Sequence, residues 1–135
     1  MQRFYKSSEF YKYIVVGSSG FLVNMGIFIL LTRLFLFSVE FASPIAIESA
    51  IISNFMLNNF WTFRSRVVKT SLLKRFVRFH MVALTAGLVN YATLLIFYYA
   101  LGLMDIIANT LGIIAATMVN FLLNSYWTWK SSSDI

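Results

Sequence analysis

The stretch NFMLNNFWTFR at residues 54–64 is repeated as NFLLNSYWTWK at residues 120–130. The two copies lie 66 residues apart, and the same offset aligns residues 10–65 with residues 76–131 without a gap. The matches include Asn, Trp and Thr, which chance pairing of apolar residues rarely places in register. The chain therefore contains a duplicated unit: repeat one at 10–65, a basic link at 66–75, and repeat two at 76–131.

The composition is that of a protein whose solvent is lipid. Of its 135 residues, 59% are hydrophobic and 12% are charged, and the mean hydropathy is +0.76. A soluble domain of this size leaves too much of its surface in water to hide so many apolar side chains. We therefore expect one all-α, multi-pass membrane domain over residues 1–135.

Four apolar spans are long enough to cross a bilayer, whose core of roughly 30 Å needs about 20 helical residues. They run over approximately residues 13–35, 42–63, 79–101 and 106–129. Each repeat is therefore predicted to be a helix hairpin. An even number of crossings returns the chain to the side where it began, so both hairpins should insert in the same orientation, as a parallel repeat.

Basic residues gather at one predicted end of the spans. They are Arg3, Lys6, Lys12, Arg64, Arg66, Lys69, Lys74, Arg75, Arg78 and Lys130. This asymmetry predicts that both termini and the link are cytoplasmic (N-in, C-in). Within it, residues 4–12 and 71–79 mix basic and aromatic side chains, as helices at the headgroup boundary do.

Spans two and four carry small and polar residues every four positions, so that these share one helical face. The positions are Ala42, Ala46, Ala50, Asn54 and Asn58 in span two, and Ala108, Gly112, Ala116, Asn120 and Asn124 in span four. Small residues at this spacing let helices approach closely in lipid. This face is therefore predicted to contact neighbouring helices.

The asparagines allow two interpretations, because a buried amide must find a partner. In one, Asn54, Asn58, Asn120 and Asn124 make hydrogen bonds between helices. In the other, they line a polar groove that Asn24 and Asn90 also face. Trp61 and Trp127 fit an interfacial aromatic belt, and beside a groove they would also suit a sugar or a prenyl chain.

Glu48 lies in span two, and its repeat counterpart is the apolar Ile114. An acid within a membrane span indicates a function, such as a proton site or a ligand for a polar headgroup. The alternatives are a pair near the outer surface with Arg33 or Glu40, or simple interfacial exposure. At the other end, Arg64, Arg75 and Arg78 could bind a phosphate, or could only orient the chain.

Several chemistries are disfavoured by what the sequence lacks. It has no cysteine and a single histidine, His80, so thiolate and protein-built metal sites are not expected. It has no nucleophile–base set, P-loop or pair of facing carboxylates, so neither an enzyme nor a bound cofactor is expected. The net charge of +6 lies between apolar spans, where it faces lipid headgroups rather than nucleic acid.

The doubled N-F-x-x-N-x-x-W-T-F/W phrase resembles the GtrA-like family over about residues 10–131. The opening FYKYIVVGSSGFLVN and the segment KRFVRF resemble it too. On the family phrase, the matching positions are Asn54, Asn58, Trp61, Arg64, Asn120, Asn124, Trp127 and Lys130. The family often has Arg or Lys directly after the second Asn, where this chain has Asn59 and Ser125.

The resemblance implies translocation of a polyprenyl-phosphate-linked sugar across a bacterial cytoplasmic membrane, beside a membrane glycosyltransferase. The alternative is a non-transporting subunit that anchors or stabilises that transferase. A small cation exporter is disfavoured, because the basic inner rim suits anionic substrates. Four spans form thin walls for a pathway, so a homo-oligomer, in particular a dimer, is expected.

Overall fold

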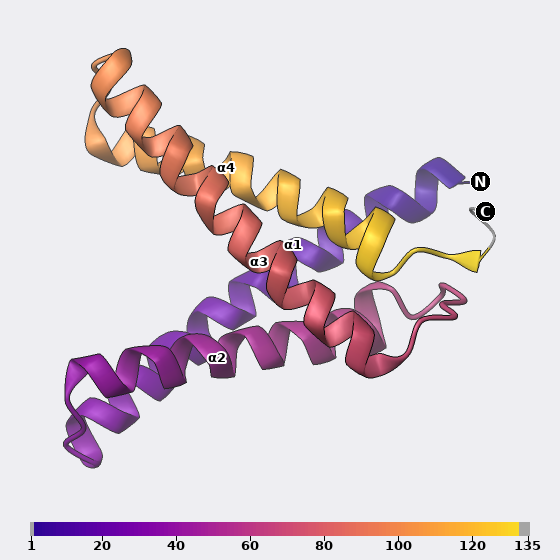
Figure 1. Ribbon diagram of the computed structural model, residues 1–135, viewed down its shortest axis with the longest axis horizontal. Coiled ribbons are helices and arrows are strands. Elements are labelled where there is room, and N and C mark those ends of the chain that lie inside the picture. The colour runs from indigo at the N-terminus through magenta and orange to yellow at the C-terminus, as the bar shows by residue number, and fades with distance from the viewer. Residues whose placement is uncertain (1, 133–135) are drawn as a thin grey trace. The chain divides into compact units, whose positions relative to one another are not determined.

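The computed structural model describes residues 2–132, with side chains from residue 7 onward. It contains four α-helices: α1 (Gln2–Ile29), α2 (Val39–Leu57), α3 (Leu72–Leu95) and α4 (Asp105–Leu123). The described residues form no strand. The chain divides into two compact units between Ser65 and Arg66, and each unit is an antiparallel helix hairpin, α1 with α2 and α3 with α4 (Figure 1). The prediction of an all-α protein with four helices in two hairpins is confirmed.

Every α-helix continues into one turn of π-helix. These turns are η1 (Leu30–Leu34), η2 (Asn58–Thr62), η3 (Ile96–Ala100) and η4 (Asn124–Thr128). A π-turn is wider than an α-turn and is often found at functional sites. In this chain the repeated phrase supplies η2 and η4, so the duplicated sequence builds a duplicated helix end.

Three helical segments are long and apolar enough to cross a membrane: Ser7–Leu34, Leu72–Ala100 and Asp105–Thr128. The predicted second span does not reach this hydropathy, because α2 carries Glu40, Pro44 and Glu48 among its apolar residues. It still packs along α1 for most of its length. That α2 also spans the bilayer, and that the termini are cytoplasmic, stay predictions.

The two basic segments predicted at the headgroup boundary are continuous with the helices that follow them. Residues 4–12 belong to α1, which is 28 residues long, or about 42 Å at 1.5 Å per residue. This exceeds the roughly 30 Å hydrocarbon core, which is compatible with the predicted position of the first turns at the headgroup boundary. Ser71 caps α3, since its Oγ accepts a hydrogen bond from the backbone N–H of Lys74 at 3.3 Å.

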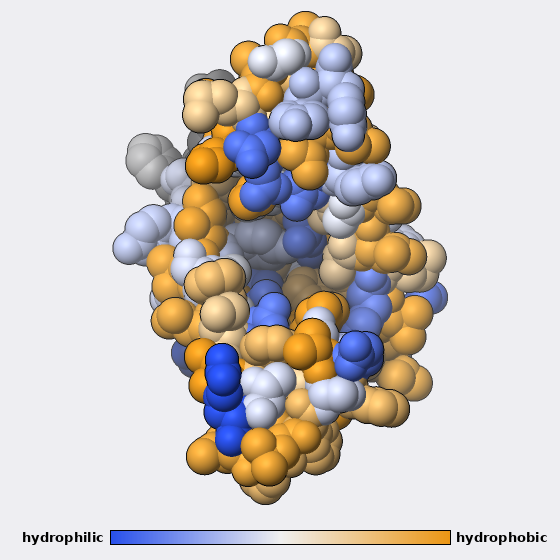
Figure 2. Space-filling model, turned by 90° about the vertical axis from the view of Figure 1, so that its left-hand side faces the viewer, coloured by the Kyte–Doolittle hydropathy of each residue, from blue (hydrophilic) through white to orange (hydrophobic). Residues whose placement is uncertain are grey.

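Large apolar side chains cover the outside of both hairpins. In the most apolar 18 residues of each segment, only 11% of the residues are buried in Ser7–Leu34 and in Leu72–Ala100, and 17% in Asp105–Thr128. Figure 2 shows apolar residues over much of the visible surface, with hydrophilic residues in smaller patches. Several hydroxyl groups within the helices bond to a carbonyl of the preceding turn, as when Thr85 donates to the carbonyl of Met81 at 3.0 Å. Both features suit a lipid solvent.

Inside each hairpin, the small-residue face is buried against the partner helix, as predicted. Ala42 and Ala46 in α2 and Ala108 in α4 have no exposed surface. Two glycines bring the helices into still closer contact. The side chain of Asn54 in α2 lies on Gly20 of α1, and that of Asn90 in α3 lies on Gly112 of α4.

The turns of the two hairpins share one conformation but differ in sequence. Gly102 has φ +66°, and its repeat counterpart Leu36 has φ +55°. A left-handed conformation costs a non-glycine residue about 1–2 kcal/mol. Leu36 is also 82% exposed, so burial within the hairpin does not offset that cost.

Replacing Gly112 with alanine should destabilise the second hairpin by about 1–3 kcal/mol, the usual cost of overpacking. A Cβ there would lie 2.8 Å from the backbone oxygen of Asn90, which cannot rotate away. The matched control is Gly87→Ala in α3, where a Cβ meets nothing within 4 Å and alanine should add about 0.5–1 kcal/mol. Denaturant unfolding in detergent micelles would measure both, and equal stabilities would contradict the packing.

Candidate functional site

The second asparagine of each repeated phrase is bound to the threonine four residues later. In η2, the Asn58 Oδ1 accepts a hydrogen bond from the Thr62 hydroxyl at 2.8 Å. In η4, the Asn124 Oδ1 accepts one from the Thr128 hydroxyl at 2.7 Å. Asn58 is 2% exposed and Asn124 is not exposed at all. These asparagines are therefore buried within their own hairpins, and their amide oxygens are hydrogen-bonded within the same helix.

The same two asparagines close the π-turns through their backbones. The Asn58 carbonyl accepts from the Phe63 N–H at 2.9 Å, and the Asn124 carbonyl accepts from the Trp129 N–H at 2.8 Å. The side chain of each asparagine thus accepts a hydrogen bond from the threonine four residues later, and its carbonyl accepts one from the backbone N–H five residues later. The spacing N-x-x-x-T in the sequence is the pattern of this local bond.

The other four predicted asparagines are half-buried. Asn120 is joined to the π-turn, since its Oδ1 accepts from the Asn124 Nδ2 at 2.8 Å. Its repeat counterpart differs: the Oδ1 atoms of Asn54 and Asn90 are buried with no hydrogen-bond partner among the described residues. Asn24 is the fourth of these half-buried asparagines. A single groove shared by all six asparagines stays a prediction.

A second doubled contact surrounds the tryptophans of the phrase. The Lys12 Nζ lies 5.7 Å from the centre of the Trp61 ring, and the Arg78 guanidinium lies 5.1 Å from that of Trp127. These pairs are related by the 66-residue offset, as are the ring pairs Tyr13–Phe63 at 6.3 Å and Phe79–Trp129 at 5.7 Å. Each contact joins the N-terminal half of one helix to the C-terminal end of its partner.

These contacts divide the predicted phosphate ligands into two groups. Arg78 is already engaged, because its Nη1 also donates to the Trp127 carbonyl at 3.0 Å. Arg75 is half-buried and has intramolecular contacts of its own. Arg64 and Lys130, which are repeat counterparts, are exposed, and neither bonds to another residue of the described part of the chain.

Arg66 is a residue that sequence reasoning treated only as part of the basic link. Its Nη1 donates to the carbonyls of Ser125 and Trp129, the latter at 3.0 Å, and its Nη2 donates to the Ser125 hydroxyl at 2.7 Å. It therefore satisfies carbonyls at the end of η4 that lack helical partners. The available signal was the small Ser125, which leaves room for a guanidinium beside Asn124.

Glu48 is on the exposed surface of α2 and not between the helices. It has an intramolecular contact, but Arg33 and Glu40 make no ion pair with any described residue. The alternative in which Glu48 pairs with Arg33 is therefore not observed. Among the described residues, no group of three or more His, Asp or Glu side chains is placed to hold a metal ion.

Residues 12–129 match the family model described as the GtrA/DPMS transmembrane domain. The chain belongs to this family. It is also 36% identical over 120 residues to a dolichol-phosphate mannosyltransferase of Pyrococcus furiosus. That match covers 89% of this chain and 33% of the relative, so the GtrA/DPMS chain spans about one third of the length of the enzyme it resembles.

Replacing Arg66 with glutamine should destabilise the second hairpin by about 1.5–3 kcal/mol, the usual worth of hydrogen bonds from a charged group. The change removes the guanidinium that bonds to Ser125 and Trp129. Arg64→Gln is the control, because it removes the same charge at an exposed side chain without such bonds. Thermal unfolding that shifts equally in both variants would show that only net charge matters.

Proposed function

We propose that this chain translocates a polyprenyl-phosphate-linked sugar across a bacterial cytoplasmic membrane. The observation that carries the proposal is the pair of exposed cations, Arg64 and Lys130, at the ends of the two hairpins. Neither bonds to another described residue, so both can accept an anionic headgroup. Their position after the family phrase, in a GtrA/DPMS domain, favours a polyprenyl phosphate.

The neighbouring tryptophans add an apolar surface to this charge. Trp61 is 42% exposed and Trp127 is 39% exposed, although each also contacts a cation. An aromatic face beside a phosphate-binding cation would contact the sugar ring or the first isoprene units. The half-buried Asn24, Asn54, Asn90 and Asn120 are the candidate polar positions along the pathway, and Glu48 is the candidate proton site.

The barrier that such a protein lowers is the passage of a polar head through hydrocarbon. A small bundle would do this by offering hydrogen-bonding groups at its surface while the prenyl chain stays in lipid. Nothing in the sequence couples the process to ATP, so consumption of the sugar on the far side, or proton movement, would drive it. A dimer would thicken the walls of the pathway.

A second candidate function has its own support. The relative from Pyrococcus furiosus is named a mannosyltransferase, and two thirds of it lie outside the match. This chain would then be the non-catalytic membrane part of such a system, and would anchor or stabilise a separate membrane glycosyltransferase.

Leaflet exchange in liposomes tests the first proposal. The purified protein is reconstituted with a labelled polyprenyl-phosphate sugar, and an impermeant reagent measures the fraction exposed outside. Wild-type exchange should exceed that of empty liposomes. In the double variant Arg64→Gln/Lys130→Gln it should fall about tenfold, the effect of roughly 1.4 kcal/mol of lost headgroup binding.

Lys69→Gln/Lys74→Gln is the matched control, since it removes two exposed positive charges from the link. Exchange that falls equally in the control would mean that net charge, and not these two positions, attracts the substrate. Wild-type exchange no faster than in empty liposomes would reject translocation. If co-expression then still raised the amount of active transferase in membranes, the anchoring function would be supported.

A further inference from the structure

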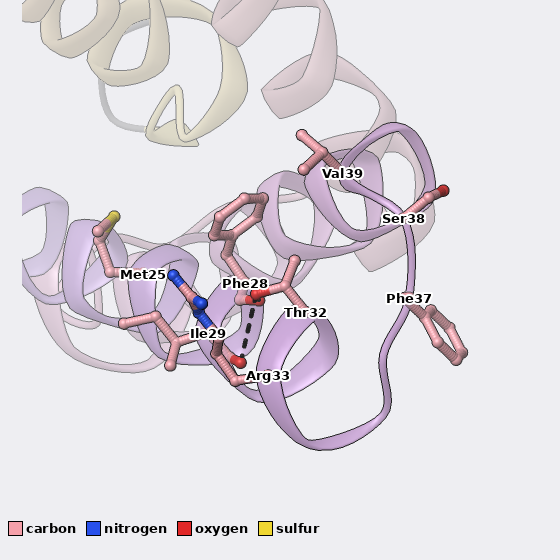
Figure 3. Close-up of a pocket in the computed structure, with 8 residues that line it drawn as sticks. All are labelled: Met25, Phe28, Ile29, Thr32, Arg33, Phe37, Ser38 and Val39. Carbon is pink, nitrogen blue, oxygen red and sulfur yellow. Dashed lines mark hydrogen bonds between the residues drawn. The ribbon is translucent and has the colours of Figure 1, made fainter.

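The first hairpin has a pocket of about 580 Å³ at the end that carries its turn. It is bounded by one face of α1 and η1 and by the start of α2 (Figure 3). The lining residues are Met25, Phe28, Ile29, Thr32, Arg33, Phe37, Ser38 and Val39. Its volume is within the range of small-molecule sites, about 300–1,000 Å³, and most of its lining is exposed, so it opens to the surroundings.

Arg33 is the one charged residue of this lining. Its side chain points into the span and not toward the nearer membrane surface. It lies in the last turn of the span Ser7–Leu34. In Figure 3 its side chain runs back along the helix toward Ile29 and Met25. Helical side chains point toward the N-terminus, and here that direction leads into the span and away from the near surface.

A guanidinium that points into a span is stabilised by an anionic partner. Charged groups near the end of a span normally extend to the headgroup layer, because a charge in hydrocarbon is costly. Arg33 forms no hydrogen bond or ion pair with another residue of the described chain. An anionic partner would therefore come from outside the hairpin.

The rest of the pocket indicates what else the ligand carries. Ser38 precedes α2, and its hydroxyl makes no capping bond, so it can donate to an anion. Thr32 is different, because its hydroxyl already donates to the Phe28 carbonyl at 2.8 Å. The remaining wall is apolar. A ligand that uses the whole pocket is thus a phosphate attached to an apolar chain.

The second hairpin has neither the cation nor the serine hydroxyl at the equivalent positions. At the offset of 66 residues, Tyr99 stands in place of Arg33 and Met104 in place of Ser38. The next position changes from Val39 to the acidic Asp105, which would repel an anion. The positive pocket therefore belongs to hairpin one and was not part of the duplicated pattern.

We propose that this pocket binds the phosphate end of a polyprenyl-phosphate lipid, with Arg33 on the phosphate and Met25, Phe28 and Ile29 on the first isoprene units. The inference rests on the proposed function, which makes a polyprenyl phosphate available in the same membrane. Within hairpin one, Arg64 is at the opposite helix end. The pocket would then be the second headgroup position, where the lipid is held after crossing.

Photo-crosslinking tests the site directly. The full chain is placed in nanodiscs of neutral phosphatidylcholine with a polyprenyl phosphate that carries a diazirine close to its phosphate. Mass spectrometry should locate the crosslink within residues 25–39. The variant Arg33→Gln should reduce this labelling about tenfold, the loss expected for a charge-assisted contact, and Arg33→Lys should restore part of it.

Lys69→Gln, which removes one exposed positive charge from the basic link, should leave labelling of residues 25–39 unchanged. Since Arg33 bonds to no other described residue, thermal unfolding of Arg33→Gln should match the wild type, which separates binding from folding. Equal labelling of the wild type and Arg33→Gln would overturn the proposal. So would displacement of the probe by phosphatidylglycerol or by inorganic phosphate at the probe's own concentration.

Leaflet exchange measured on the same proteins separates this site from the proposed function. Labelling that depends on Arg33, without exchange in the wild type, would retain the lipid-phosphate site and reject translocation. Exchange in the wild type, with labelling that is unchanged in Arg33→Gln, would retain translocation and reject the site.

Discussion

The bond between an asparagine amide and a threonine hydroxyl at each hairpin end is the interaction on which the other contacts depend. Asn58 with Thr62, and Asn124 with Thr128, fix a π-turn at the position where the helix would otherwise fray. The wider turn sets the direction of the residues that follow. Phe63 and Trp129 are thereby turned inward, where they are almost completely buried against Tyr13 and Phe79.

This dependence explains why polar residues can stand at the ends of otherwise apolar helices. In lipid, an amide without a partner would cost several kcal/mol, and the two π-turns satisfy the amide oxygens within a single helix. The amide oxygens of these turns therefore need no partner from a neighbouring helix, although the carbonyls at the end of η4 also accept hydrogen bonds from Arg66. The two tryptophans of the phrase, Trp61 and Trp127, remain partly exposed beside it, as do the cations that follow, Arg64 and Lys130.

The contacts between the helices differ in the two hairpins, although the helix ends are alike. In hairpin one the side chain of Asn54 packs on Gly20, and in hairpin two the side chain of Asn90 packs on Gly112. These contacts are not related by the repeat, because the counterparts of the two glycines are Ala86 and Ala46. The helix ends have thus stayed alike while the middle of each hairpin has been repacked.

Sequence alone predicted the hairpins and the family, because the phrase recurs in register and the apolar spans are long. It did not decide the role of Asn58 and Asn124. An asparagine that bonds within its own helix and one that lines a groove appear in a sequence as the same residue at the same spacing. Arg66 was missed for a different reason. Its partners Ser125 and Trp129 are about 60 residues away, and no local pattern reports such a contact. The pocket at Arg33 depends on rotamer direction, which a sequence does not contain.

The turns of both hairpins are short and apolar. Phe35, Leu36 and Phe37 form the tip of the first, and Leu101, Gly102 and Leu103 that of the second. With Leu36 held in a left-handed conformation and exposed, the tip of the first hairpin is shaped for the headgroup layer and not for water. Each tip thus consists of a few apolar residues, and residues 35–38 and 101–104 form no long polar loop for a partner in the aqueous phase. Under the proposed translocation, a partner that receives the lipid-linked sugar at such a tip would itself have to reach into the membrane surface.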